Sequence, residues 1–147
     1  AWLFLTHPEQ MEALKADPEL AAQAVEEVLR FEAPVQATSR IVSEDREVAG
    51  CPMKKSQPVF MSLAAANRDP DQFENPEAFD ITKRRKSHVS FGGGAHICIG
   101  APLARIEARG VYTKLFERYP NLKLAEQDLT WRALPFFRGM EKLEVEA

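Results

Sequence analysis

A glycine-rich segment that holds a cysteine and leads into a long helical pattern constrains this chain more than any other feature. Four of the seven glycines fall between Gly92 and Gly100, and Cys98 lies among them. Glycine allows left-handed backbone angles and close approach of a flat ligand. A helix predicted from about Pro102 to Tyr119 would direct its amide groups and dipole at the sulfur and favour the thiolate form. The alternative is an ordinary buried cysteine in a turn.

Composition excludes several classes of protein. The 147 residues carry a formal net charge of −3, which does not indicate binding of nucleic acid. The two cysteines, Cys51 and Cys98, are too few for a zinc finger or an iron–sulfur cluster. A disulfide between them is possible, although no secretion signal accompanies it. No apolar run approaches the length of a membrane span.

The start of the chain is typical of the cut end of a longer helix. Ala1–Thr6 is apolar from its second residue, lacks an initiator Met and has no basic region of the kind that begins a signal peptide. We therefore expect residues 1–147 to be part of a longer protein.

Helices are predicted before and after a β-rich middle region. Thr6 and Glu9 fit a capping box for a helix to about Lys15. Asp17 fits an N-cap for the next helix, which Pro34 ends. The apolar face of that second helix is predicted from the helical spacing of Ala21, Ala24, Val25, Val28 and Leu29.

Short β-type runs predict small antiparallel sheets. Ser39–Val42 and Val59–Leu63 would pair, with turns at 43–45 and 50–52. Three further runs occur in the tail, at Leu129–Trp131, Phe136–Phe137 and Leu143–Val145. The predicted fold class is therefore mainly α with small antiparallel β-sheets.

The glycine-rich segment resembles the haem-binding loop of the cytochrome P450 family at every fixed position. The pattern is Phe91-x-x-Gly94-x-His96-x-Cys98-x-Gly100, with Ala104 beyond it. The resemblance extends along essentially all 147 residues, but corresponds only to the C-terminal, proximal-haem part of a single family domain. The distal helix and the N-terminal part of that domain are expected to lie outside this chain.

This resemblance implies haem b with Cys98 as its axial thiolate ligand. Phe91 would pack beside the sulfur, and the backbone amides of Ile99 and Gly100 would donate hydrogen bonds to it. His96 is similar to a residue that contacts a haem propionate, and Arg40 to one that pairs with a propionate. Cofactor contacts are therefore expected from Phe91, Gly92, His96, Cys98, Ile99, Gly100, Ala104 and Arg40.

Glu27 and Arg30 match the Glu-x-x-Arg signature of the family, which implies a buried charge network beneath the haem loop. The helical spacing of the apolar residues predicts instead that both side chains lie on a solvated face. A helix buried on both sides would satisfy both patterns, and we adopt that interpretation. The arginine that completes the network is open between Lys83, Arg84 and Arg85.

Two apolar segments would face the substrate by resemblance. One is Val35, Gln36 and Ala37, and the other is the tail turn around Phe136 and Phe137. Plain packing is the alternative for both. Apolar side chains at these positions fit a small hydrophobic substrate.

The resemblance implies a cytoplasmic haem-thiolate monooxygenase that uses O2 and electrons from a redox partner. Between residues 83 and 109 the chain has six basic residues and one acid, which fits docking of an acidic ferredoxin- or flavodoxin-type donor or simply a solvated rim. Two alternatives remain open: a peroxygenase that uses H2O2 directly, and an inactive haem-binding fragment. The fragment is favoured if the isolated chain exposes apolar surface and binds haem poorly.

Overall fold

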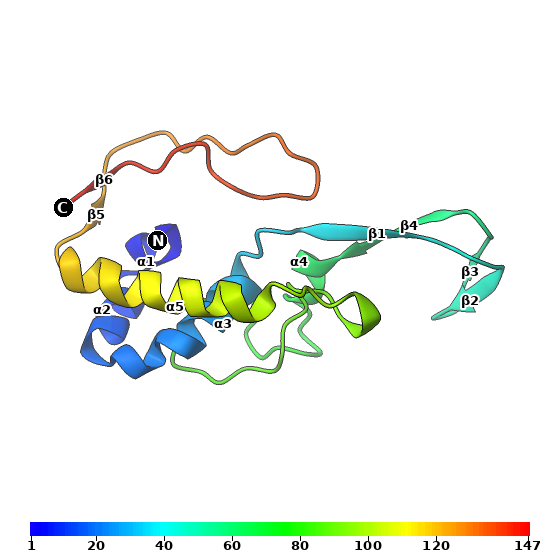
Figure 1. Ribbon diagram of the computed structural model, residues 1–147, viewed down its shortest axis with the longest axis horizontal. Coiled ribbons are helices and arrows are strands. Elements are labelled where there is room, and N and C mark those ends of the chain that lie inside the picture. Colours follow the sequence, from blue (N-terminus) through cyan, green and yellow to red (C-terminus); the bar gives the residue numbers. More distant parts are fainter.

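The computed structural model describes all residues from 1 to 147 and places a cluster of helices at one end and a β ribbon at the other (Figure 1). The helices are α1 (Trp2–Thr6), α2 (Pro8–Ala16), the 3-10 helix η1 (Pro18–Leu20), α3 (Ala21–Phe31), α4 (Leu63–Ala66), the 3-10 helix η2 (Gly94–His96) and α5 (Ala101–Arg118). The strands are β1 (Ala37–Ile41), β2 (Arg46–Val48), β3 (Cys51–Met53), β4 (Pro58–Ser62), β5 (Lys123–Leu124) and β6 (Val145–Glu146). The predicted class, mainly α with small antiparallel sheets, is confirmed.

The first helices begin differently from one another. The predicted capping box is wrong. The Thr6 hydroxyl donates to the carbonyl oxygens of Trp2 and Leu3 at the end of α1, and does not cap the start of α2. His7 precedes α2 without a side-chain cap. Asp17 does act as an N-cap: its carboxylate accepts the Glu19 amide proton, but η1 comes first and α3 follows from it.

A core of ten buried residues holds α1, α2, α3 and α5 together. Its members are Leu3, Phe4, Met11, Leu14, Ala21, Ala24, Phe79, Ile81, Phe116 and Leu122. Phe4 is fully buried and makes edge-to-face contacts with Phe79, Tyr112 and Phe116. The core thus fixes α5, which follows the glycine-rich segment, against α3. No helix is both long and apolar enough to cross a membrane.

The β ribbon consists of two separate antiparallel pairs. β1 pairs antiparallel with β4, as the sequence predicts, and the observed register places Arg40 opposite Val59. β2 pairs with β3 at the far end of the ribbon (Figure 1). The predicted turn at 50–52 is displaced, since Ala49 and Gly50 both adopt positive φ and form the turn, and Cys51 already begins β3.

The C-terminal tail contains less strand than predicted. β6 at Val145–Glu146 pairs with β5, a strand that no sequence pattern predicted. The runs around Trp131 and Phe137 form only isolated bridges, Trp131 with Met140 and Phe137 with Val35 and Leu134. The turns between these bridges hold the tail close to the start of the β ribbon.

Asn67, at the end of α4, ties the segment before the glycine-rich loop to α3. The Asn67 side chain is fully buried. Its amide donates to the Ser90 hydroxyl at 2.7 Å, and its carbonyl oxygen accepts the Val89 amide proton at 2.8 Å. The Ser90 hydroxyl in turn donates to the Leu29 carbonyl oxygen at 2.7 Å. One buried side chain therefore anchors the backbone directly before Phe91.

We predict that Asn67→Ala lowers the free energy of unfolding by about 2–3 kcal/mol, because it leaves the Val89 amide without its buried acceptor and removes one of the two hydrogen bonds of the Ser90 hydroxyl. Chemical denaturation of the natural protein that contains this chain measures the change. Asn121→Ala is the control, since Asn121 is exposed. Equal effects of the two substitutions would contradict the anchoring role of Asn67.

Candidate haem-thiolate site

The loop from Phe91 to Gly100 presents Cys98 on the surface. Gly92 and Gly94 adopt positive φ of 72° and 63°, which turn the chain around η2. The Cys98 amide donates to the Phe91 carbonyl oxygen at 2.9 Å and closes the loop. The Cys98 carbonyl oxygen then accepts the Ala101 amide proton at 3.2 Å, where α5 begins. Both the start and the end of the loop are therefore fixed by backbone hydrogen bonds at the cysteine.

The sulfur of Cys98 lies at the open side of this loop. A Cβ added to Gly100 would lie 3.8 Å from the sulfur, so the backbone of Gly100 runs close beside it. Cys98 itself is exposed, and Ile99 next to it is 99% exposed. The thiol is not a packed core cysteine, which removes the alternative interpretation of the segment.

Glu27 and Arg30 on α3 form a buried ion pair. The carboxylate accepts two hydrogen bonds from Arg30, from Nε and Nη2, at 2.8 Å each. The side chains are 2% and 1% exposed. The amphipathic pattern is therefore wrong in placing this side of α3 in solvent, because the segments 67–80 and 83–90 cover it.

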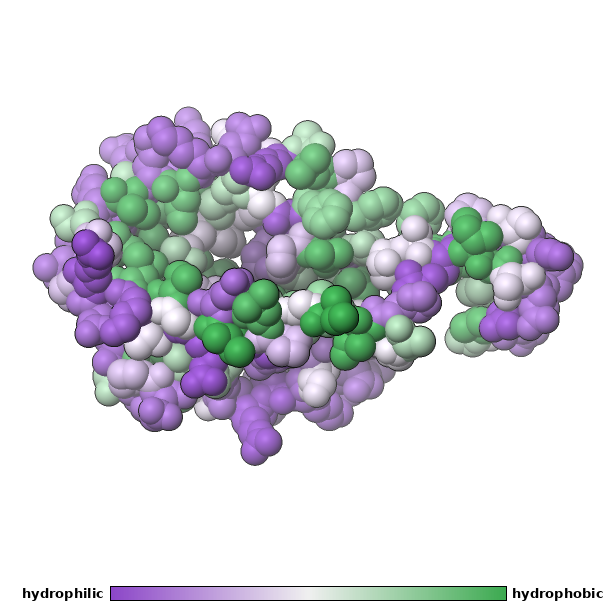
Figure 2. Space-filling model, viewed as in Figure 1, coloured by the Kyte–Doolittle hydropathy of each residue, from purple (hydrophilic) through white to green (hydrophobic).

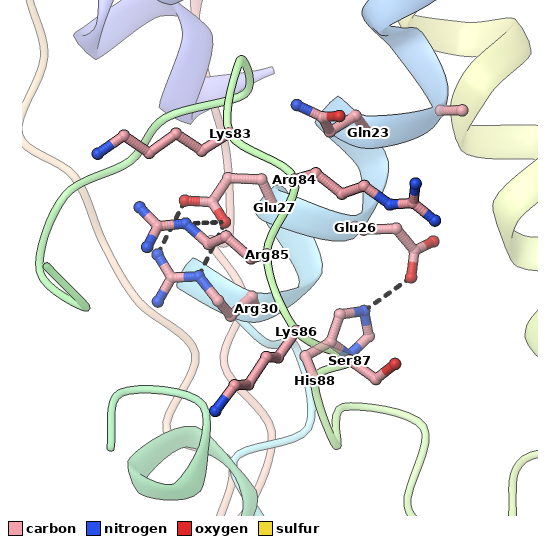
Figure 3. Close-up of a pocket in the computed structure, with 11 residues that line it drawn as sticks. Gln23, Glu26, Glu27, Arg30, Lys83, Arg84, Arg85, Lys86, Ser87 and His88 are labelled. Carbon is pink, nitrogen blue, oxygen red and sulfur yellow. Dashed lines mark hydrogen bonds and ion pairs between the residues drawn. The ribbon is translucent and has the colours of Figure 1, made fainter. Parts of the chain in front are cut away.

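Arg85 is the third member of this network. Its Nε lies 3.1 Å from Glu27 Oε2 (Figure 3). Its guanidinium also donates to the carbonyl oxygens of Glu74 and Ala78. Lys83 and Arg84, the other two candidates, are exposed. Arg85, and not Lys83 or Arg84, therefore completes the network of Glu27 and Arg30.

Carbonyl oxygens satisfy the remaining donors of Arg30. Its Nη1 donates to Asn67 and Pro76 at 3.0 and 2.9 Å, and its Nη2 donates to Ala78 at 3.0 Å. Glu27 Oε1 also accepts the Asp80 amide proton at 3.1 Å. One carboxylate and two guanidinium groups therefore hold a loop of irregular backbone that has no strand or helix of its own.

A second charged cluster joins α3 to the start of α5. Glu26 accepts hydrogen bonds from Arg105 Nε and Nη2 at 2.6 and 2.9 Å. His88 Nε2 lies 3.2 Å from the same carboxylate (Figure 3). The hydrogen bond from Arg105 holds the pKa of Glu26 below its usual value, and burial lowers the pKa of His88 despite the nearby carboxylate.

Sequence reasoning missed several of these residues. Asn67, Ser90, Glu26 and His88 had no assigned role, and Arg105 was taken only as part of a basic rim. No local pattern indicates their roles, because their partners are distant in sequence: Asn67 bonds to Ser90, and Glu26 to Arg105.

Comparison with known proteins gives the family. Residues 9–135 match the family model of cytochrome P450. The chain is 45% identical over 141 residues to a biotin biosynthesis cytochrome P450 of Bacillus subtilis, with 96% of this chain and 36% of the relative covered. It is 40% identical over 146 residues to 6-deoxyerythronolide B hydroxylase of Saccharopolyspora erythraea, covering 98% and 36%.

The chain belongs to the cytochrome P450 family. Its fold agrees with the solved structure of P450BioI in complex with hexadec-9Z-enoic acid ligated acyl carrier protein, with a TM-score of 0.95 and 44% identity over 98% of this chain and 37% of that one. The predicted P450 fold class is therefore confirmed. The chain spans about 36% of the length of these curated relatives. Membership of the family implies haem with cysteine thiolate ligation.

The residues around Cys98 fit such a group. No cluster of three or more His, Cys, Asp or Glu could hold a bare metal ion. An iron bound by one thiolate must therefore carry its other ligands with it, as the iron of haem does. The surface beside the sulfur is an independent test of whether haem fits here. A porphyrin needs an apolar surface to lie on and basic groups near its propionates.

An apolar surface surrounds the cysteine of this P450 chain. Figure 2 shows hydrophobic residues over the first part of α5 and the loop that precedes it. Ile97, Ile99, Leu103 and Ile106 are each at least 60% exposed. Ala104 is half-buried on the first turn of α5, and its amide donates to the Gly100 carbonyl oxygen. Exposed apolar area of this kind marks a binding surface.

The two side chains predicted to contact haem propionates lie on two different elements. His96 ends η2, two residues before Cys98, and is exposed. Arg40 lies on β1, is exposed, and donates to the Ser39 carbonyl oxygen and the Thr38 hydroxyl within its own strand. The two side chains make no hydrogen bond with each other. Their roles toward haem remain predictions.

The two predicted substrate-facing segments lie side by side. The Gln36 amide donates to the Phe136 carbonyl oxygen at 2.7 Å, and Val35 bridges to Phe137. Ala37 opens β1 directly after them. Phe136 adopts a positive φ of 71° and stacks on Phe60 with ring centroids 5.6 Å apart. Phe136 and Phe137 are 44% and 58% exposed, so both rings are accessible.

We predict that Glu27→Gln lowers the free energy of unfolding by about 3–5 kcal/mol, since it leaves two buried guanidinium groups without their carboxylate. Denaturation of the natural protein measures the loss. Glu44→Gln removes the same charge from an exposed pair with Arg46 and should change stability by less than about 1 kcal/mol. A loss at Glu27 no larger than at Glu44 would refute the network.

Proposed function

We propose that this chain is the C-terminal, thiolate-bearing part of a single P450 domain whose activity is haem-thiolate monooxygenation. The observation that carries the proposal is an exposed Cys98 thiol, held at the start of α5 by backbone hydrogen bonds, in a chain of this family. The coverage of about 36% of the curated relatives supports a longer domain, with residues 1–147 as an incomplete part of it.

Each residue of the loop has a distinct task in this proposal. Cys98 ligates the iron as thiolate, and the amides of Ile99 and Gly100 tune its charge. Phe91 and Gly92 shape the loop and limit access of water to the sulfur. His96 and Arg40 hold propionates through charge-assisted hydrogen bonds. When bound, haem supplies the activation of O2, and the protein supplies its orientation and its electrostatic surroundings.

The substrate in this proposal is a small hydrophobic organic molecule that receives one oxygen atom. Two accessible apolar segments, 35–37 and 134–137, support it, because they meet beside β1 and present aromatic surface. Val35, Gln36, Ala37, Phe136 and Phe137 would contact the substrate. One solved structure similar to this chain, CYP109E1 from Bacillus megaterium, is in complex with testosterone, which is a molecule of this type.

The test is the absorption spectrum of the reduced, CO-bound natural protein. A thiolate ligand shifts the Soret band to the red, so the wild type should show this band and Cys98→Ser should lack it. Cys51→Ser is the matched control, because Cys51 is the other exposed free cysteine. We expect the control to keep the band of the wild type.

Two results would contradict the proposal. The first is a wild-type protein that binds haem without the red-shifted band. The second is loss of the band in Cys51→Ser with retention in Cys98→Ser, which would assign the ligand to the β2–β3 hairpin.

We further propose that the electron donor is an acidic ferredoxin- or flavodoxin-type protein that docks beside α3. Lys83, Arg84 and Lys86 are exposed there, on the segment that leads to the cysteine loop. They line a pocket of about 340 Å³ together with Glu26 and other residues (Figure 3). Arg105 is engaged by Glu26, so the free lysines and Arg84 are the better docking groups.

Charge reversal tests this surface. Lys86→Glu should slow the first electron transfer from an acidic ferredoxin about tenfold at low salt, and the difference should shrink as salt screens the charges. Stopped-flow reduction under CO measures the rate. Lys55→Glu, an exposed lysine beside the β2–β3 hairpin, is the control and should leave the rate unchanged. An equal rate for Lys86→Glu and wild type would exclude docking at this lysine.

A further inference from the structure

Phe91 is held by side chains that come from two other parts of the chain. The Arg105 guanidinium lies over the Phe91 ring, with its Cζ 4.7 Å from the ring centroid. The His88 ring lies 6.0 Å from the Phe91 ring, centroid to centroid. Both Arg105 and His88 contact one carboxylate, that of Glu26 on α3. We name Glu26, Arg105 and His88 the Phe91 clamp.

The orientation of each clamp member is determined by its contacts. Arg105 uses both Nε and Nη2 on the two oxygens of Glu26, a bidentate arrangement that fixes the plane of the guanidinium. His88 Nδ1 accepts the Ser90 amide proton at 3.1 Å, and His88 Nε2 lies 3.2 Å from the Glu26 carboxylate without forming a hydrogen bond to it. The His88 side chain is only 3% exposed. The plane of each group is thereby set before it meets Phe91.

The backbone of Phe91 is also linked to the cysteine. Its carbonyl oxygen accepts the Cys98 amide proton at 2.9 Å. Any rotation of Phe91 about its backbone therefore moves the acceptor that positions Cys98. The path from Glu26 to the thiol consists of a bidentate ion pair, a cation–π contact and one backbone hydrogen bond.

We propose that Glu26 is a positioning residue for the thiolate: through Arg105 it fixes Phe91, and through Phe91 it sets the hydration and orientation of Cys98. This inference rests on the proposed function, since it assigns the clamp to the thiolate ligand. Glu26 and Arg105 neutralise each other, so their combined field at the iron is small. Their effect must therefore be mainly geometric.

The experiment measures the reduction potential of the haem-loaded natural protein. Glu26→Gln should shift the potential to more positive values, because water reaching the sulfur withdraws negative charge from it. The CO complex should also lose its red-shifted band about fivefold faster on mild heating, the size of effect expected between residues in contact. Arg105→Lys should act in the same direction, since lysine keeps the charge but has no planar group to stack on Phe91.

A double-substitution cycle separates geometry from charge. In a Phe91→Leu background, adding Glu26→Gln should cause no further shift of the potential if Glu26 acts through the ring. Glu117→Gln is the matched control, because it breaks an exposed pair with Lys114 at the other end of α5 and should shift nothing.

Three outcomes would overturn the inference. An unchanged potential in both Glu26→Gln and Arg105→Lys would show that the clamp does not act on the thiolate. The same shift for Glu26→Gln with and without Phe91 would show a direct field effect. A wild type without the red-shifted CO band would overturn the proposed function and this inference together, whereas the first two leave the proposed function intact.

Discussion

The carboxylate of Glu27 is the interaction on which the rest of this structure depends. It is almost fully buried and receives two hydrogen bonds from Arg30, one from the Asp80 amide, and an ion pair from Arg85. The two guanidinium groups then bind carbonyl oxygens in the irregular segment between Asn67 and Ala78. Only 19 residues of the chain are buried, so the apolar core is small. The Glu27 network holds together the part of the chain that lies beyond this core.

Helix α3 links this centre to the cysteine loop. Ala21 and Ala24 face the apolar core, Glu27 faces the network, and Glu26 reaches across to Arg105 on α5. Residues 67–90 are anchored by the hydrogen bond between Asn67 and Ser90. They lead to Phe91, whose carbonyl oxygen accepts the Cys98 amide proton and closes the cysteine loop. The position of the cysteine loop thus depends on one short helix that contacts the apolar core, the Glu27 network and α5.

The sequence predicts those parts that depend on local patterns. The helix after Gly100, the β1–β4 pair and the Asp17 cap all follow from spacing and residue type. The Thr6–Glu9 box failed because the Thr6 hydroxyl found acceptors in the preceding turn. The apolar spacing of α3 taken alone was wrong in placing Glu27 in solvent, whereas the adopted interpretation, a helix buried on both sides, is confirmed because loops from elsewhere cover Glu27. The choice of Arg85 over Lys83 could not be made, since it depends on how residues 74–85 fold back onto α3.

X-ray absorption at the iron edge tests the proposed ligation of iron by the Cys98 sulfur, because the scattering distinguishes sulfur from nitrogen and oxygen among the atoms bound to iron. For the haem-loaded natural protein we predict one sulfur neighbour of iron, which is absent in Cys98→Ser and present in Cys51→Ser. A wild type without a sulfur neighbour, or a Cys98→Ser variant that keeps one, would refute this ligation.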